Sequence, residues 1–243
     1  MISPSLRSDL APTGKIRVGI NYANPVLATR DPASGELRGV AVDLAHEIGQ
    51  RVDLAVELVG YDAAGKMVER LKSGEWDIAF LAIDPGREGE IAFTPPYIEI
   101  EGTYLVPAGS PLRAIADVDR EGVRIALAAG AAYDLFLSRN IKHAELVRAP
   151  TPITAFELLV AGKVEALAGV KQTLVTNAAK LAGSHVLDGR FLAIGQAVGI
   201  PKGRDAGAIY LREFIENAKA SGLVARAIEK AGVRGVSIPP KAG

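Results

Sequence analysis

The chain has 243 residues, of which 49% are hydrophobic, so it can bury a substantial core as one large domain or as two smaller ones. Lysine plus arginine and aspartate plus glutamate both total 28, and this balance, without a basic block, argues against nucleic acid or an anionic membrane as the main partner. Cysteine is absent, which excludes disulfides and cysteine-rich metal sites, and the three widely spaced histidines form no ligand pair, so we expect neither a metal site nor a cofactor.

The N-terminus and the hydropathy of the chain leave its location open. Residues 1–18 contain no apolar region of the signal-peptide kind, and no window reaches the roughly 18 uninterrupted apolar residues that a membrane span needs. The short polar lead before Gly14 fits two cases. The protein is periplasmic if a leader has been removed, and cytoplasmic if it is naturally leaderless.

The first half of the chain alternates between segments with the character of strands and of helices. Strands are predicted over residues 15–20, 54–59 and 76–83, and helices over residues 39–51 and 63–73, with a turn at residues 31–35. The segment 76–83 is apolar almost throughout, as expected of a strand that is covered on both faces. This alternation indicates a parallel sheet with helices on both sides.

The same order of elements then starts again. Strands are predicted over residues 122–128, 144–148 and 164–168, with helices over residues 132–139 and 154–161. Residues 199–203 open a last segment, in which helices are predicted over residues 206–221 and 223–231. The second half repeats the order of the first without repeating its sequence, which indicates two similar α/β lobes.

The stretch from Ser73 to Tyr97 carries the clearest resemblance to a known family. It reads as a helix end, a buried strand, a loop with one arginine, and an apolar segment closed by Pro-Pro-Tyr, with Arg87 six residues before Phe93. This layout resembles the family 3 extracellular solute-binding proteins, periplasmic receptors that feed polar amino acids and related small acids to ABC transporters. The resemblance extends from Lys15 to about Val233, and it rests mainly on the order and spacing of the motifs.

The resemblance implies a two-lobed α/β fold of the periplasmic-binding-protein type II. Lobe 1 would comprise residues 1–99 and 198–243, and lobe 2 residues 100–197. The chain would cross between the lobes near residues 98–102 and again near residues 193–197. The ligand would lie in the cleft between the lobes.

Arg87 is the leading candidate for a ligand contact. Loops at the carboxyl ends of parallel strands line the ligand crevice of open α/β sheets, and a guanidinium matches a carboxylate in two-point contact. In the family the arginine grips the ligand carboxylate; the alternative is a solvated loop arginine. The family has hydroxyl residues where Ala82 and Asp84 stand. Asp84 could pair with Arg87, face the ligand, or simply start a turn before proline.

Other candidates in the first half follow the first two predicted strands. The resemblance gives Tyr61 a stacking role on the ligand, and the alternative is a tyrosine at the edge of the core with a solvated hydroxyl. Asn21 ends the first predicted strand, and Asn24 stands near the tyrosine of the aromatic wall that many amino-acid binders have there; both amides can donate and accept. Ordinary turn chemistry is the alternative for both.

In the second half, the resemblance places a carboxylate-binding loop at Ala128–Ala132 and an ammonium-binding aspartate at Val170. The amides of Gly130 and Ala131 suit an anion because they lie at a helix start, although a small-residue helix entry is an equally simple reading. A buried ammonium without a carboxylate is costly, so Val170 makes an ordinary α-amino acid a doubtful ligand. Lys171 and Gln172 could turn into the cleft, and the alternative for the lysine is solvation.

These observations favour a binding protein that performs no chemistry. We expect a monomer that binds a small carboxylate or zwitterion without a normally presented α-amino group and delivers it to an ABC permease. One alternative is an enzyme on the same fold, such as a dehydratase of cyclic dienyl acids, for which Asp84 and Asp134 are the acidic residues near the expected cleft. Another is a ligand-sensing module for a membrane partner.

Overall fold

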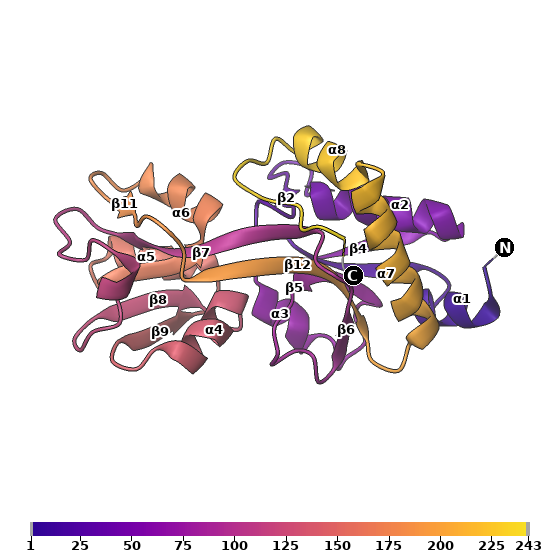
Figure 1. Cartoon of the computed structure of the whole chain (residues 1–243), viewed down its shortest axis with the longest axis horizontal. Coiled ribbons are helices and arrows are strands. Elements are labelled where there is room, and N and C mark those ends of the chain that lie inside the picture. The colour runs from indigo at the N-terminus through magenta and orange to yellow at the C-terminus, as the bar shows by residue number, and fades with distance from the viewer. Residues whose placement is uncertain (1, 242–243) are drawn as a thin grey trace. The chain divides into compact units, whose positions relative to one another are not determined.

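A computed structural model describes residues 2–241, which fold as two compact units (Figure 1). Unit 1 comprises residues 2–99 and 195–241, and unit 2 comprises Ile100–Ile194. Both boundaries fall within strands, the first in β7 (Ile98–Val106) and the second in β12 (Leu192–Pro201). Within residues 2–241, no helix combines the length and the apolar character that a bilayer crossing requires.

The sheet of unit 1 is mixed rather than fully parallel. Its strands are β1 (Ile16–Asn21), β4 (Val56–Tyr61), β5 (Ile78–Ala82), β6 (Ile91–Phe93) and part of β12. β4, β1 and β5 are parallel neighbours, as predicted. β12 runs antiparallel to β5, and β6 runs antiparallel to β12. The predicted parallel sheet with helices on both sides thus holds for β4, β1 and β5, and β12 and β6 add antiparallel strands beyond β5.

Helices cover both faces of this sheet. They are α1 (Pro4–Leu10), α2 (Val40–Val52), α3 (Ala64–Glu69), α7 (Asp205–Ala220) and α8 (Leu223–Lys230), and a short hairpin joins β2 (Thr29–Arg30) to β3 (Leu37–Arg38). On the face of α3, Met67 packs with Trp76, Ala79 and Leu81, all of them buried. α2 lies over the opposite face, next to α8 (Figure 1). β5, which is buried along its whole length, is thus covered on both sides, as its apolar composition predicted.

The N-terminal segment is a folded part of unit 1 and not only a polar lead. Ser3 caps α1 by accepting from Leu6 N–H at 3.2 Å, and Leu10 is completely buried. Asp9 accepts from the N–H of Gly207 at 3.0 Å, in the first turn of α7. A helix of seven residues is too short to show periodicity, so the only sequence signals were a serine cap followed by proline.

Unit 2 repeats the central arrangement. Three strands are parallel neighbours in the order β9 (Glu145–Ala149), β8 (Arg124–Ala128) and β10 (Ala166–Val170). β7 pairs antiparallel with β10, and β11 (His185–Val186) pairs antiparallel with β7. The helices are α4 (Ala132–Asn140), α5 (Pro152–Val160) and α6 (Lys171–Ala178), with a 3₁₀ turn at Ile115–Asp117. Thr151 caps α5. α6 was not predicted, because it starts directly after β10 without a connecting loop.

Each unit has an arginine–carboxylate pair with the same hydrogen bonds at the amino ends of its parallel strands. In unit 1, Arg17 donates from its backbone N–H, Nε and Nη2 to the carboxylate of Asp77, at 3.0, 2.9 and 2.8 Å. In unit 2, Arg124 makes the same three contacts with Glu165, at 2.7, 3.1 and 2.7 Å. Each carboxylate lies three residues after a glycine and directly before an apolar strand. The halves therefore share a short local sequence pattern, which the prediction of order without sequence repetition had overlooked.

Tyr97 contains a buried hydroxyl without a hydrogen-bond partner within residues 2–241. Its ring lies edge-on to Phe80 at 5.8 Å between centroids. Because an unsatisfied buried polar group costs free energy, we expect Tyr97→Phe to keep the ring contact and to raise the free energy of unfolding by about 1 kcal/mol. Thermal and urea denaturation would measure this change. A clear loss of stability would show that the hydroxyl has a partner in solution.

Candidate functional site

The carboxyl ends of β1, β4 and β5 meet at one edge of the sheet in unit 1. In the parallel register Asn21 pairs with Tyr61, and Ile20 pairs with Phe80 two residues before the end of β5. Crevices that bind ligands in open α/β sheets lie at such an edge. The predicted site residues Asn21, Tyr61 and Ala82 end these three strands, and Asn24, Asp84 and Arg87 lie in the loops that follow β1 and β5.

Arg87 is buried, with 4% of its surface exposed. Its Nη1 donates to the carbonyl of Ala82 at 2.8 Å, and its backbone N–H donates to the carbonyl of Asp84 at 2.9 Å. Burial lowers the pKa of the guanidinium to about 10, although the nearby charge of Asp84 acts in the opposite direction. This is not the environment of a solvated loop arginine. A cation held at such a cost is stabilised by an anion.

Asp84 shapes the loop that carries Arg87. It is also 4% exposed, and its Oδ1 accepts from the N–H of Gly86 at 2.8 Å. This contact within the turn is the local chemistry expected of an aspartate before proline. The carboxylate thus fixes the loop and places a negative charge near the guanidinium.

The other three polar candidates in unit 1 make local contacts. The hydroxyl of Tyr61 donates to Glu75 Oε2 at 3.1 Å, and its ring packs on the core cluster around Trp76. Burial and the bond to Glu75 raise the pKa of this hydroxyl. Asn21 Oδ1 accepts from Ala23 N–H at 3.1 Å, and Asn24 Oδ1 accepts from Val26 N–H at 3.2 Å. A ligand role for these residues remains a prediction.

Buried polar side chains concentrate at this edge. In the described part of unit 1 they are Asn24, Asp77, Asp84, Arg87, Thr94 and Gln196. Asp77 lies at the opposite edge, and the hydroxyl of Thr94 accepts from the backbone of Val198 at 3.0 Å. Gln196 was not predicted as a site residue, because a single glutamine within the apolar strand β12 gives no recognisable pattern.

Unit 2 has a corresponding edge at the ends of β8 and β10. Gly130 has a positive φ of 69° and donates its N–H to Asp134 Oδ2 at 2.8 Å, while Ala131 is the N-cap of α4. Gln172 lies in the first turn of α6, directly after Lys171, whose Nζ lies 2.7 Å from Glu101 Oε2. The predicted residues Gly130, Ala131 and Gln172 thus all lie at this edge of unit 2.

Asp134 holds the loop before α4 together. It is 4% exposed, and besides Gly130 it binds Ser138 Oγ at 3.1 Å and Arg148 Nε at 3.0 Å through Oδ1. Both carboxylate oxygens are therefore engaged by donors of unit 2. This arrangement stabilises the turn and the start of the helix.

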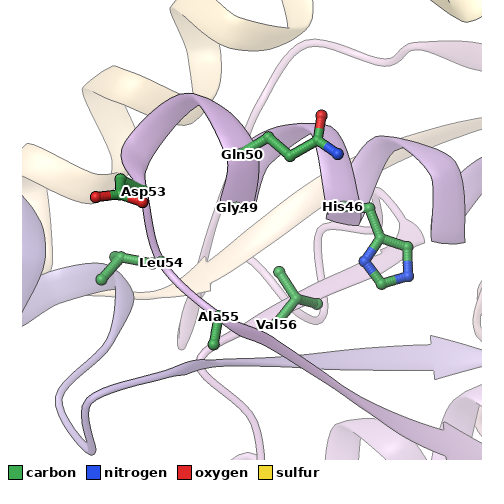
Figure 2. A pocket seen from close by; sticks show the side chains of 7 residues that line it. All are labelled: His46, Gly49, Gln50, Asp53, Leu54, Ala55 and Val56. Carbon is green, nitrogen blue, oxygen red and sulfur yellow. The ribbon is translucent and has the colours of Figure 1, made fainter.

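A surface hollow lies elsewhere in unit 1, between the carboxyl end of α2 and the amino end of β4 (Figure 2). It is lined by His46, Gly49, Gln50, Asp53, Leu54, Ala55 and Val56. A Cβ atom on Gly49 would lie 2.5 Å from Val56 Cγ2, so glycine allows α2 to approach the strand closely. The hollow lies at the amino edge of the strand and contains none of the predicted site residues, so we assign it no ligand.

Comparison with known proteins identifies one family and several similar proteins. The model of the bacterial extracellular solute-binding proteins, family 3, matches residues 16–233. A segment of 131 residues, 53% of the chain, is 28% identical to the virulence sensor protein BvgS of Bordetella bronchiseptica, and it covers only 10% of that protein's length. The glutamine-binding protein GlnH of an ABC transporter of Bacillus subtilis is 21% identical over 218 residues, which cover 86% of the chain and 77% of GlnH.

A solved structure confirms the predicted fold class. It is an amino acid ABC transporter substrate-binding protein from Streptococcus pneumoniae, bound to L-arginine, with a TM-score of 0.79 and 19% identity. The match covers 98% of this chain and all of the other. At this identity the likeness concerns the fold, which is the two-lobed α/β fold of the periplasmic binding proteins.

Proposed function

The chain belongs to family 3 of the bacterial extracellular solute-binding proteins, and on this premise we propose that it captures a small carboxylate outside the cytoplasm for uptake by an ABC permease. The family is a family of binding proteins, and GlnH is a glutamine-binding protein of an ABC transporter. The observation that carries the proposal is the buried guanidinium of Arg87 at the carboxyl edge of the sheet in unit 1.

The chemistry of Arg87 favours an acidic solute. A buried guanidinium prefers a planar anion that accepts two parallel hydrogen bonds, and a carboxylate meets that requirement. Its lowered pKa indicates that Asp84 only partly compensates the cost of burying the charge. A bound carboxylate would compensate the rest, so part of the binding energy would come from relieving a cost already present in the free protein.

The edge of unit 2 favours a solute that does not bury an ammonium group beside Val170. Val170, at the end of β10, is apolar and 8% exposed, where the family resemblance places an aspartate. The next residue is the cation Lys171, which lies beside Glu101. A buried ammonium at this place would lack a carboxylate from Val170. We therefore propose an organic acid, or a zwitterion whose cation is remote or shielded, as the solute class.

Binding without chemistry is the simplest role for this site. A dehydratase would need an acidic residue such as Asp84 or Asp134. The carboxylate of Asp134 accepts hydrogen bonds from Gly130, Ser138 and Arg148. General acid–base catalysis needs a carboxyl group that can exchange a proton with the substrate. Asp84 likewise has a structural contact with Gly86. These contacts support a binding protein over a dehydratase.

A thermal-shift screen of matched acids tests the solute class. The matched panel pairs L-glutamate with pentanedioate, L-glutamine with 5-amino-5-oxopentanoate, and L-leucine with 4-methylpentanoate, so each pair differs only in the α-ammonium group. We expect at least one deaminated acid to raise the melting temperature more than its amino acid does, because a ligand that binds only the native state stabilises it. Stabilisation by the amino acids alone would refute the proposed class.

The similarity to BvgS supports one second candidate, a sensing domain for a membrane partner. Both roles use the same binding site, so they differ only in the step after the solute has bound. Deleting the gene and measuring uptake of the isotopically labelled solute separates them. Loss of uptake supports the transporter role, whereas normal uptake with an altered transcriptional response to the solute supports the sensor.

A further inference from the structure

Gln196 stands out among the buried polar residues of unit 1. It lies in β12 and is 3% exposed. Its backbone carbonyl accepts from Tyr97 N–H at 2.8 Å, but within residues 2–241 its side-chain amide makes no hydrogen bond. Its nitrogen and oxygen are nevertheless not sealed from solvent, so the amide is accessible at the sheet edge, and a polar side chain in an otherwise apolar strand needs an explanation.

The strand register places Gln196 beside the loop of Arg87. Gln196 is the direct antiparallel partner of Ala82, and such partners project from the same face with Cβ atoms about 5 Å apart. The neighbouring position confirms the face, because a Cβ on Gly195 would meet Pro96 and Ile83 on the other side. Ala82 also provides the carbonyl that accepts from Arg87 Nη1. Gln196 is thus the strand partner of the residue that anchors the guanidinium.

We propose that Gln196 contacts the solute and donates its side-chain N–H to the carboxylate held by Arg87, an inference that rests on the function proposed above. Ala82 and Asp84, the neighbours of Arg87 at this edge, provide no neutral side-chain donor. The amide of Gln196 on the adjacent strand supplies a neutral donor on the same face as Ala82, while its oxygen can accept from a hydroxyl or amide of the solute. The amide of Gln196 exchanges its contact with solvent for a contact with the solute when the solute binds.

The test uses Gln196→Met, which keeps the length of the side chain and removes the amide. Gln50→Met is the matched control, because Gln50 is an exposed glutamine on α2 that lines the hollow of Figure 2. The parent and both variants are titrated with every acid of the matched panel. For each acid that stabilises the parent, we expect Gln196→Met to bind at least tenfold more weakly and Gln50→Met to bind normally.

The melting temperature of the unliganded variants separates a solute contact from a structural role. Without solute, Gln196→Met should melt at the same temperature as the parent or higher, because the replaced amide has no protein partner. A lower melting temperature with unchanged affinities would assign Gln196 a structural role and overturn the inference. If Arg87→Lys weakens binding and Gln196→Met does not, the inference fails and the proposed function stands. If no acid of the panel stabilises the parent, both fail.

Discussion

Replacing Asp77 with alanine should lower the free energy of unfolding by about 3–5 kcal/mol, the range for breaking a buried ion pair from one side. Asp77 is completely buried and accepts three hydrogen bonds from Arg17. Its Oδ1 also lies 3.3 Å from Nη1 of Arg204, which in turn donates to the carbonyl of Asp9. Alanine would leave two largely buried guanidinium groups without their shared anion. Urea denaturation followed by circular dichroism measures the change.

The equivalent pair in unit 2 provides the matched control. Glu165 makes the same three contacts with Arg124, but the two side chains are 38% and 43% exposed, against none and 21% for Asp77 and Arg17. Because solvent compensates the lost partner, Glu165→Ala should cost at most about 1 kcal/mol. The hydrogen bond to Asp77 raises the pKa of Arg17, in agreement with a tight pair. Equal losses in the two variants would show that burial does not determine the strength of these pairs.

The sequence predicted the elements that have a strong pattern of their own. The apolar segment 76–83 became β5, and the amphipathic segment 206–221 became α7. The direction of β12 could not be predicted, because it is set by the path of the chain from unit 2 back to unit 1 and not by the composition of the strand. α6 was missed for a related reason, since its first turn is polar and follows β10 without a turn signal.

Part of the candidate site could be predicted from local sequence and part could not. The place of Arg87 followed from its spacing after an apolar strand, but that spacing could not predict that the side chain is buried. Gln196 illustrates the limit most clearly. Only the register between β5 and β12 makes it a neighbour of Ala82, and no local pattern encodes that register. Local sequence thus identifies which loops form the edge of a sheet, while strand pairing determines which side chains join them.

Replacing Arg87 with alanine should weaken binding of acidic solutes by about 2 kcal/mol or more, roughly thirtyfold, because a desolvated carboxylate would lose its charge-assisted partner. Arg87→Lys should recover only part of this loss, since an ammonium cannot form two parallel hydrogen bonds to one carboxylate. Calorimetry with the acid of the matched panel that stabilises the parent most measures both affinities. The unliganded Arg87→Ala variant should remain folded, because it removes a charge whose burial is costly.

Removing the charge of Asp84 should have the opposite effect on affinity to removing that of Arg87. Its charge lies near Arg87 and favours the guanidinium in the free protein, so it competes with an incoming carboxylate. Asp84→Asn retains an oxygen that can accept from Gly86 N–H and removes the charge, and it should therefore bind the acid more tightly than the parent. Weaker binding after Arg87→Ala together with tighter binding after Asp84→Asn would identify the pair as the anion-binding centre. Unchanged affinity in both variants would mean that the carboxylate is held elsewhere, and the proposed solute class would lose its physical basis.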